Sequence, residues 1–313
     1  MMDMFEEKAI KPMLIKDMLD PFSSPDYIYE LKLDGIRCIA YLDEVYTDLR
    51  NKRNDIMLPR FPELSNINTF VKGKCILDGE LIIIKKGVPD FFEVQRRSLM
   101  SDRFKIELAS NQYPACFVAY DILYINNKQI TGLPLMERKK LLEEVVNEDI
   151  KLAISRFVPE HGIELFNLAK EQHLEGVIAK VKDSKYYLDK RTKEWIKFKF
   201  LADKDFAVCG YINKEKGMIS LILGQYRGND LLYKGHVTLG VRSNFANEYN
   251  CIEINYSPFR LTPSGNEDAV WLEPTLVCVV QYMPNDKGYL RQPVFKGIRD
   301  DKTPLECQED IHI

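Results

Sequence analysis

Short apolar runs with strand-like alternation recur along the chain, separated by turns rich in Gly, Asn and Pro. Two longer segments, Leu135–Val146 and Ile163–His173, have helical periodicity and predict helices. Between and around them, the pattern predicts strands over Tyr27–Leu31, Ile36–Leu42, Gly176–Val181 and Trp195–Phe200, with two further segments in Cys75–Ile84 broken at Asp78-Gly79.

The pattern changes after residue 201, where short strands dominate. The predicted strands are Phe206–Ile212, Met218–Leu223, Leu231–Leu239 and Thr275–Tyr282, with a helical segment near Ser243–Tyr249 among them. This density of short strands is typical of a small barrel or sandwich. We therefore predict two domains, residues 1–202 and 203–313.

The composition is that of a folded globular protein. Of 313 residues, 45% are hydrophobic and 29% charged, which excludes disorder as the main state. The net charge of −3 argues against a chain that coats nucleic acid by bulk charge. Residues 182–204, however, hold seven lysines and one arginine against four acidic residues, interleaved with aromatic side chains. This segment is either a solvated face or a groove for a polyanion.

The seven cysteines include no C-x-x-C pair, and most lie in apolar runs, which predicts buried, reduced thiols. The four histidines lack ligand spacing and receive no role. The segment Met1–Ile10 has no apolar signal core, and apolar stretches such as Leu81–Ile84 are too short to span a bilayer. We expect a cytoplasmic protein with no membrane partner.

The string Glu30-Leu-Lys-Leu-Asp-Gly-Ile-Arg37 carries the first candidate chemistry. A lysine beside a glycine turn and near a second cation can lose its proton and act as a nucleophile, as Lys32 would here. An exposed lysine in a hairpin is the alternative. Lys197 and Lys199 share one face of a predicted strand, either as the polar side of a sheet edge or as two cations converging on phosphates.

Two glutamates and one tyrosine add further candidates. The carboxylates of Glu80 and Glu175 are hard oxygen ligands that suit Mg²⁺, although surface glutamates are usually only solvated. Tyr120 lies in an apolar run, where it is either a core aromatic or a flat face for a purine.

The string around Lys32 resembles motif I of the covalent nucleotidyltransferases, which comprise ATP-dependent DNA ligases, RNA ligases and mRNA-capping guanylyltransferases. The further motifs of that family follow in order and span residues 30–302. They are Lys52-Arg53-Asn54, Asp78-Gly79-Glu80, Phe117–Asp121, Glu175–Lys180, Trp195–Lys199, Leu290–Phe295 and Ile298–Lys302. Lys52 stands where Ser is usual and Tyr120 where Phe is usual.

The resemblance implies an α+β fold, in which an antiparallel-sheet nucleotidyltransferase (adenylation) domain precedes a small all-β OB-fold barrel. It also implies that Lys32 forms a lysyl-AMP intermediate. The implied ATP- or AMP-binding residues are Glu30, Arg37, Arg53, Glu80, Tyr120, Lys197, Lys199, Arg291 and Lys302, and the implied ligands of Mg²⁺ or Mn²⁺ are Glu80 and Glu175. Arg291 and Lys302 belong to the second domain, so the resemblance implies that this domain closes for the first step.

The implied activity is sealing of nicks in duplex DNA by a monomeric, minimal two-domain ligase of bacterial or phage type. An RNA ligase or a capping guanylyltransferase is the alternative within the superfamily. The Arg291-x-Pro-x-Phe295 string and the Arg53-Asn54 pair favour the DNA ligase. A non-catalytic oligonucleotide-binding protein is disfavoured because all expected catalytic side chains are present. A Ku-like or sliding-clamp partner is left open.

Overall fold

The computed structural model describes residues 3–172, 174–283 and 290–309. The chain divides into two compact units, Met1–Lys199 and Phe200–Ile313. The limits 1–202 and 203–313 stay a prediction. The two divisions differ only at residues 200–202, the last of which is the first residue of β13 (Ala202–Asn213). His173, the predicted end of a helix, and His312 lie outside the described residues.

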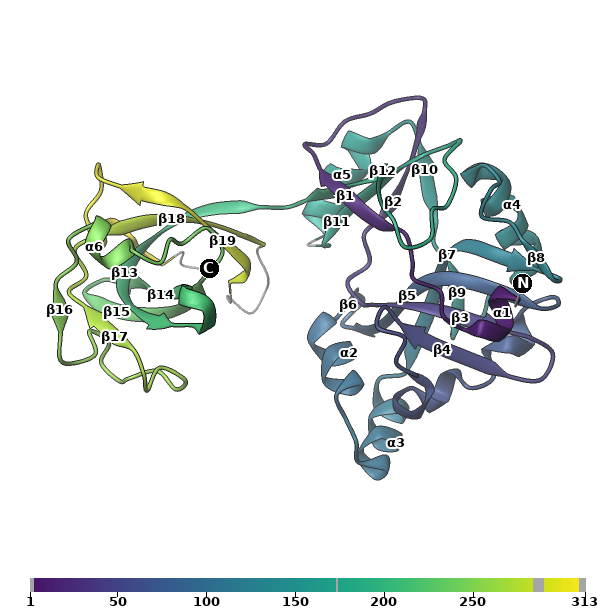
Figure 1. Cartoon of the computed structure of the whole chain (residues 1–313), viewed down its shortest axis with the longest axis horizontal. Coiled ribbons are helices and arrows are strands. Elements are labelled where there is room, and N and C mark those ends of the chain that lie inside the picture. Colours follow the sequence, from purple (N-terminus) through teal and green to yellow (C-terminus); the bar gives the residue numbers. More distant parts are fainter. Residues whose placement is uncertain (1–2, 173, 284–289, 310–313) are drawn as a thin grey trace. The chain divides into compact units, whose positions relative to one another are not determined.

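Two sheets form the frame of the N-terminal unit (Figure 1). The first has the order β1 (Leu14–Met18), β12 (Arg191–Lys199), β11 (Gly176–Val181), β2 (Tyr27–Leu31) and β10 (Phe157–Pro159). The second has the order β4 (Thr47–Asn51), β3 (Ile36–Leu42), β5 (Cys75–Lys85), β7 (Ala115–Ile125) and β8 (Lys128–Gln129), with β6 (Val88–Pro89) on β5 and β9 (Leu152–Ile154) on β7. Most pairings are antiparallel; β1 with β12 and β7 with β9 are parallel.

Helices flank these sheets. They are α1 (Met4–Glu7), α2 (Phe91–Ser98), α3 (Arg103–Gln112), α4 (Leu135–Val145) and α5 (Gly162–Glu171). The predicted helices correspond to α4 and α5. The apolar pattern did not predict α3, and the structure gives the reason, because Phe104 and Leu108 of this helix are exposed rather than buried.

The two sheets share a buried cluster that joins their facing sides. Ile39 of β3 and Ile76 of β5 pack in one cluster with Ile178 of β11 and Trp195 of β12. Burial alternates along β12, where Ile196 and Phe198 are buried on the face opposite the lysines, as the pattern predicted. The polar face of β12 is therefore directed toward the space between the sheets.

The predicted break at Asp78-Gly79 is wrong, because β5 runs through both residues. A Cβ atom on Gly79 would lie 2.5 Å from the Phe117 ring and 2.5 Å from the Val118 carbonyl oxygen. The glycine therefore allows β7 to approach β5 closely, where the pairing register shifts, and it does not make a turn.

The C-terminal unit is a strongly curved sheet. Its strands are β13, β14 (Ile219–Arg227), β15 (Asp230–Val237), β16 (Glu253–Ile254), β17 (Val270–Leu272), β18 (Val277–Met283) and β19 (Arg291–Arg299), with the short α6 (Phe245–Glu248). β13 pairs with β14, β17 and β18, and β18 pairs with β19. The sheet curls back on itself, since the backbone N–H of Phe295 in β19 donates to the Leu239 carbonyl beyond β15.

The predicted α+β class is confirmed, and the all-β C-terminal unit is consistent with an OB fold. All seven cysteines are free, and five of them are buried, as predicted. Within the described residues, no helix is long and apolar enough to cross a membrane.

Candidate active site

A cavity of about 350 Å³ in the N-terminal unit is lined by residues of both sheets. Seven predicted site residues line it: Glu30, Lys32, Arg37, Glu80, Tyr120, Lys197 and Lys199. The other lining residues are Leu14, Ile15, Leu33, Lys52, Ile178, Lys180, Arg191 and Trp195. The fold thus gathers cations, carboxylates and aromatic rings from distant parts of the chain around one space.

Lys32 and Glu175 form a close ion pair at this cavity. Lys32 follows β2, and its backbone N–H donates to the Gly176 carbonyl at 2.9 Å. Its Nζ lies 2.5 Å from Glu175 Oε2, and the Glu175 side chain is only 4% exposed. The second carboxylate oxygen, Oε1, lies 3.2 Å from Lys199 Nζ. Glu175 thus holds two lysines at one point of the lining.

Lys197 and Lys199 of β12 lie in surroundings that disfavour their charged forms. Burial, the nearby Lys32 charge and Arg191 together lower the pKa of Lys197. Burial and the Lys32 charge also lower the pKa of Lys199, although Glu175 opposes the shift. A polyanionic ligand would relieve this repulsion, so the site is suited to bind phosphates.

Glu80 of β5 is a carboxyl of the lining whose pKa is strongly raised. Burial raises its pKa to about 8, with Lys32 and Arg37 opposing the shift and Asp78 and Glu175 adding to it. A cation bound in place of the proton would stabilise the ionised form of this carboxyl.

The carboxylates of Glu80 and Glu175 suit a divalent ion that takes most of its ligands from water and substrate. Among the described residues, no group of three or more His, Cys, Asp or Glu side chains is placed to hold a metal. Mg²⁺ is commonly bound by one or two carboxylates together with waters and substrate phosphates. Glu80 and Glu175 meet that requirement only if the remaining ligands come from water and a bound nucleotide.

Arg37 of β3 is fixed by several acceptors. Its Nε and Nη2 donate to the two carboxylate oxygens of Asp78 at 3.0 and 2.6 Å, and its Nη1 donates to the Met13 carbonyl at 2.7 Å. The Tyr186 hydroxyl donates to Asp78 Oδ2 at 2.7 Å. This two-point pairing holds the guanidinium rigidly beside the cavity.

Aromatic rings and a buried lysine form another part of the lining. The rings of Tyr120 and Trp195 meet edge to face, with centroids 6.0 Å apart. Lys180 Nζ lies 4.7 Å from the Tyr120 centroid and 4.1 Å from that of Trp195, and it pairs with Glu30 at 2.9 Å. Aromatic faces beside a donor and an acceptor are the chemistry that recognises a nucleobase.

Two family models match this chain one after the other. The family model described as ATP dependent DNA ligase domain matches residues 8–199, and the model described as ATP dependent DNA ligase C terminal region matches residues 214–302. The chain belongs to the ATP-dependent DNA ligases. The predicted recognition is confirmed, and the alternatives of RNA ligase and capping guanylyltransferase are not favoured by these matches.

Bacterial relatives match this ligase over most of its length. SPbeta prophage-derived DNA ligase-like protein LigB of Bacillus subtilis (strain 168) is 28% identical and covers 93% of this chain and 99% of its own. Multifunctional non-homologous end joining DNA repair protein LigD of Mycobacterium tuberculosis (strain ATCC 25618 / H37Rv) is 27% identical over 96% of this chain. The match spans only 40% of that LigD.

A solved structure supports the same assignment. The structure titled mycobacterial DNA ligase D complexed with ATP and MES is 25% identical, with a TM-score of 0.56. The match covers 97% of this ligase and 99% of that chain.

Four of the predicted site residues are not in the cavity lining. One of them, Glu175, contacts the lining residues Lys32 and Lys199. Arg53 is exposed in the turn after β4, and its neighbour Lys52 lines the cavity instead. Arg291 begins β19 of the C-terminal unit. Lys302 belongs to the same unit, where its Nζ lies 2.5 Å from Asp205 Oδ2.

The structure also adds residues that the sequence interpretation did not single out. Asp78 anchors Arg37, and Lys180 pairs with Glu30. Both lie inside strings already matched to motifs, and that position could have identified them as site residues. Lys139 of α4, which also pairs with Glu30 at 2.6 Å, lies in no such string.

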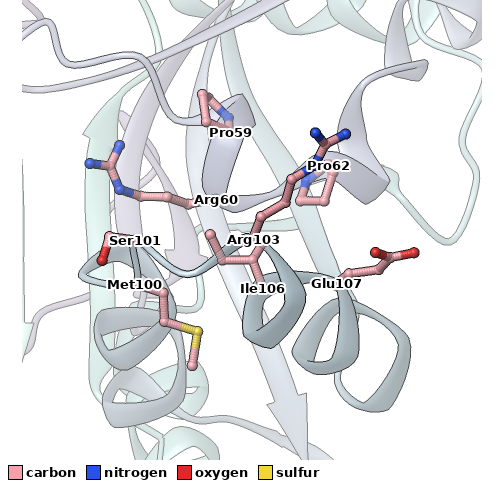
Figure 2. A pocket seen from close by; sticks show the side chains of 8 residues that line it. All are labelled: Pro59, Arg60, Pro62, Met100, Ser101, Arg103, Ile106 and Glu107. Atoms are coloured by element: carbon pink, nitrogen blue, oxygen red, sulfur yellow. The ribbon is translucent and has the colours of Figure 1, made fainter.

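A larger groove of about 890 Å³ lies elsewhere on the same unit (Figure 2). Its lining is Pro59, Arg60, Pro62, Met100, Ser101, Arg103, Ile106 and Glu107. None of the predicted site residues is in this lining. The smaller cavity is the better candidate active site, because convergent charged groups indicate chemistry more strongly than size does.

Proposed function

We propose that Lys32 is the nucleophile with which this DNA ligase takes AMP from ATP. Its amine attacks the α-phosphorus, a P–N bond forms, and the bond from that phosphorus to the bridging oxygen of pyrophosphate breaks. The observation that carries the proposal is the 2.5 Å contact between Lys32 Nζ and Glu175 Oε2. It places an acceptor at the atom that must release a proton before attack.

The remaining steps transfer the AMP and seal the strand. An oxygen of the 5′-phosphate at a nick attacks the lysyl-AMP phosphorus, which frees Lys32 and leaves AMP joined to the DNA. The neighbouring 3′-hydroxyl then attacks the 5′-phosphate, forms the phosphodiester bond and releases AMP. The proton of the hydroxyl passes to solvent. The protein's part is positioning and charge neutralisation.

The cavity residues receive roles that match their surroundings. Lys197 and Lys199 hold the phosphates, since burial and the nearby Lys32 charge lower their pKa values and a bound anion would favour their charged forms. Arg37 lies toward the ribose. Glu80 and Glu175 are the protein ligands for Mg²⁺ or Mn²⁺, which would neutralise phosphate charge when bound. Arg53, Arg291 and Lys302 are proposed to reach the nucleotide or nick phosphates during the reaction.

The base is proposed to be read by Tyr120, Glu30 and Lys180. The Tyr120 ring offers a stacking face, and Glu30 and Lys180 line the same cavity. A carboxylate accepts a hydrogen bond from the 6-amino group of adenine, and an ammonium donates to its N1 atom. Guanine presents the opposite pattern at these two positions, so this pair favours ATP over GTP.

The test is covalent labelling of the full chain with ATP or GTP carrying ³²P at the α-phosphate, in the presence of Mg²⁺. We expect label from ATP only, loss of label in Lys32→Ala, and discharge of the label by nicked duplex DNA. Lys16→Ala, at an exposed position of β1, is the control and should label normally. Absence of label on the unaltered chain with either nucleotide would overturn the proposal.

The wider setting is also part of the proposal. We infer that the ligase acts as a monomer in the cytoplasm of a bacterium or a phage-infected cell. The lysine-rich segment 182–204 adjoins the cavity through Arg191 and is proposed to contact the DNA backbone. A comparison of DNA nicks with nicks containing RNA strands would test the choice of polynucleotide.

A further inference from the structure

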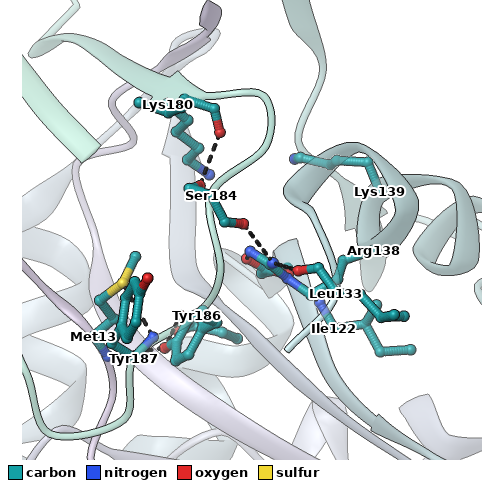
Figure 3. Close-up of polar contacts among 12 residues, drawn as sticks. Met13, Ile122, Leu133, Arg138, Lys139, Lys180, Ser184, Tyr186 and Tyr187 are labelled. Atoms are coloured by element: carbon teal, nitrogen blue, oxygen red, sulfur yellow. Dashed lines mark hydrogen bonds and ion pairs between the residues drawn. The ribbon is translucent and has the colours of Figure 1, made fainter. Parts of the chain in front are cut away.

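A buried cluster of charges stands at the edge of the cavity. Glu30 Oε1 lies 2.6 Å from Lys139 Nζ and 2.9 Å from Lys180 Nζ, and Ser155 Oγ donates to Glu30 Oε2 at 2.7 Å. The three charged side chains are each only 2–3% exposed. Figure 3 shows Lys139 on α4 and Lys180 on β11. Their ion pairs with Glu30 join these two separate elements at one carboxylate.

The charges of this cluster depend on one another. Burial alone would raise the pKa of Glu30, but Lys139 and Lys180 outweigh burial and lower it. Burial lowers the pKa of Lys180 to about 8; Glu30 opposes this shift and Lys139 adds to it. Of the two lysines, Lys139 has the larger effect on the pKa of Glu30.

Lys139 differs from the other two residues in its access to a ligand. Glu30 and Lys180 line the cavity, whereas Lys139 is not among the residues that line it. Its charged contact with the lining is the ion pair with Glu30. Its neighbour on the same helix, Lys140, is 79% exposed and contacts Glu144 instead, which provides a matched comparison.

We propose that Lys139 is a positioning residue for base recognition, which holds Glu30 as an ionised hydrogen-bond acceptor and so makes the cavity select purines with a 6-amino group. The inference rests on the proposed function, since it takes the ligand to be an adenine nucleotide. The two lysines contact Oε1 as ion pairs, and Ser155 takes one of roughly two acceptor positions of Oε2, so Oε2 can still accept from a ligand. An ionised carboxylate cannot donate, so it favours an amino group and repels an oxo group.

The experiment compares AMP with purine riboside 5′-monophosphate, which lacks only the 6-amino group. Neither can adenylylate Lys32, so calorimetric titration of the full chain measures binding alone. The unaltered chain is expected to prefer AMP by about tenfold or more, the value of a hydrogen bond to a charged group. In Lys139→Met this preference is expected to fall to about threefold or less, while affinity for purine riboside monophosphate changes by less than about twofold.

Two further variants separate charge from packing. Lys139→Arg retains the positive charge and should keep most of the preference for AMP. Lys140→Met alters the neighbouring exposed lysine and should behave as the unaltered chain. Lys139→Gln replaces Lys139→Met if the latter does not fold, as judged by circular dichroism and thermal unfolding.

Several outcomes would overturn the inference: an unaltered chain that binds the two nucleotides equally, a neutral Lys139 variant that keeps the full preference for AMP, or a folded variant that loses both nucleotides equally. The last result would assign Lys139 a purely structural role. Failure of the proposed function looks different, because it is loss of ³²P labelling from ATP on the unaltered chain, whatever the ratio of the two affinities.

Discussion

Burial sets the chemistry of Glu80 at the scale of a single residue. Its carboxyl has a pKa of about 8 in the folded chain, against an ordinary value of 4.5. Between these two pH values the folded state holds a proton that the unfolded state has lost. Stability from this group is therefore fully present below pH 4.5 and is lost as the pH rises through about 8.

Glu80→Gln is expected to remove this pH dependence. The free energy of unfolding of the unaltered chain should fall with rising pH between 4.5 and 8, with Glu80 contributing at most about 1.4 kcal/mol per pH unit. The variant should show a flatter slope and should be relatively more stable at pH 8 and above. Urea unfolding at a series of pH values measures both slopes.

The control is Glu137→Gln, at an exposed position of α4, which should leave the slope unchanged. A Glu80→Gln slope equal to that of the unaltered chain would contradict the prediction. The same variant should also bind Mg²⁺ less tightly in the presence of ATP, since a neutral amide is a weaker ligand than a carboxylate.

Close strand pairing positions the reactive residues at the scale of elements. Gly176 begins β11 with φ of +147°, and a Cβ atom there would lie 2.1 Å from the Phe198 carbonyl oxygen of β12. The adjacent Glu175 contacts Lys32 after β2 and Lys199 on β12. The absence of a side chain at residue 176 thus allows three strands to bring their functional groups within ion-pair distance.

Gly176→Ala is therefore expected to damage both stability and catalysis. The strain and the clash should cost about 1–3 kcal/mol of unfolding free energy, and displacement of Glu175 should slow adenylylation of Lys32 by about tenfold or more. Thermal unfolding and single-turnover labelling measure the two effects. Gly132→Ala, where a Cβ atom would meet nothing within 4 Å, is the control and should change neither.

The two units must cooperate at the scale of the whole molecule if Lys302 acts on the nucleotide. Lys302 and Arg299 both pair with Asp205 Oδ2 within the C-terminal unit, at 2.5 and 3.0 Å. The Asp205 contact raises the pKa of Lys302, so this lysine stays charged at neutral pH. If Lys302 serves a reaction in the N-terminal unit, it would act only in the step for which the two units close.

Lys302→Ala is expected to slow the first step and spare the last. Labelling of Lys32 by ATP should fall by about 100- to 1,000-fold, the range for loss of one preorganised donor to charge that develops in a transition state. Sealing of a nick that already carries AMP should proceed at nearly the normal rate. Single-turnover assays of the two steps test this separation.

Lys296→Ala, at an exposed position of β19, is the control for charge on that unit. An unchanged labelling rate in Lys302→Ala would remove the C-terminal unit from the first step. An equal loss in both steps would assign Lys302 to DNA binding in general.

Much of the site was predictable because its reactive groups stand in short local strings. Lys32, Glu80, Lys197 and Lys199 each lie in a string whose spacing is set by one strand and its turn, and the cavity includes all four. The turn after β4 was less predictable. Arg53 matched a motif, yet Lys52 is the residue that lines the cavity, because the conformation of the turn decides which neighbour faces inward.

The sequence by itself determined the family, the α+β class, the all-β character of the C-terminal part and the candidate nucleophile. Local periodicity and ordered motifs carry this information directly. Only the tertiary structure decided that Lys139 and Lys180 share one oxygen of Glu30, and that Arg37 is held by Asp78. These contacts join distant segments, and packing alone determines which distant charges meet when water is excluded.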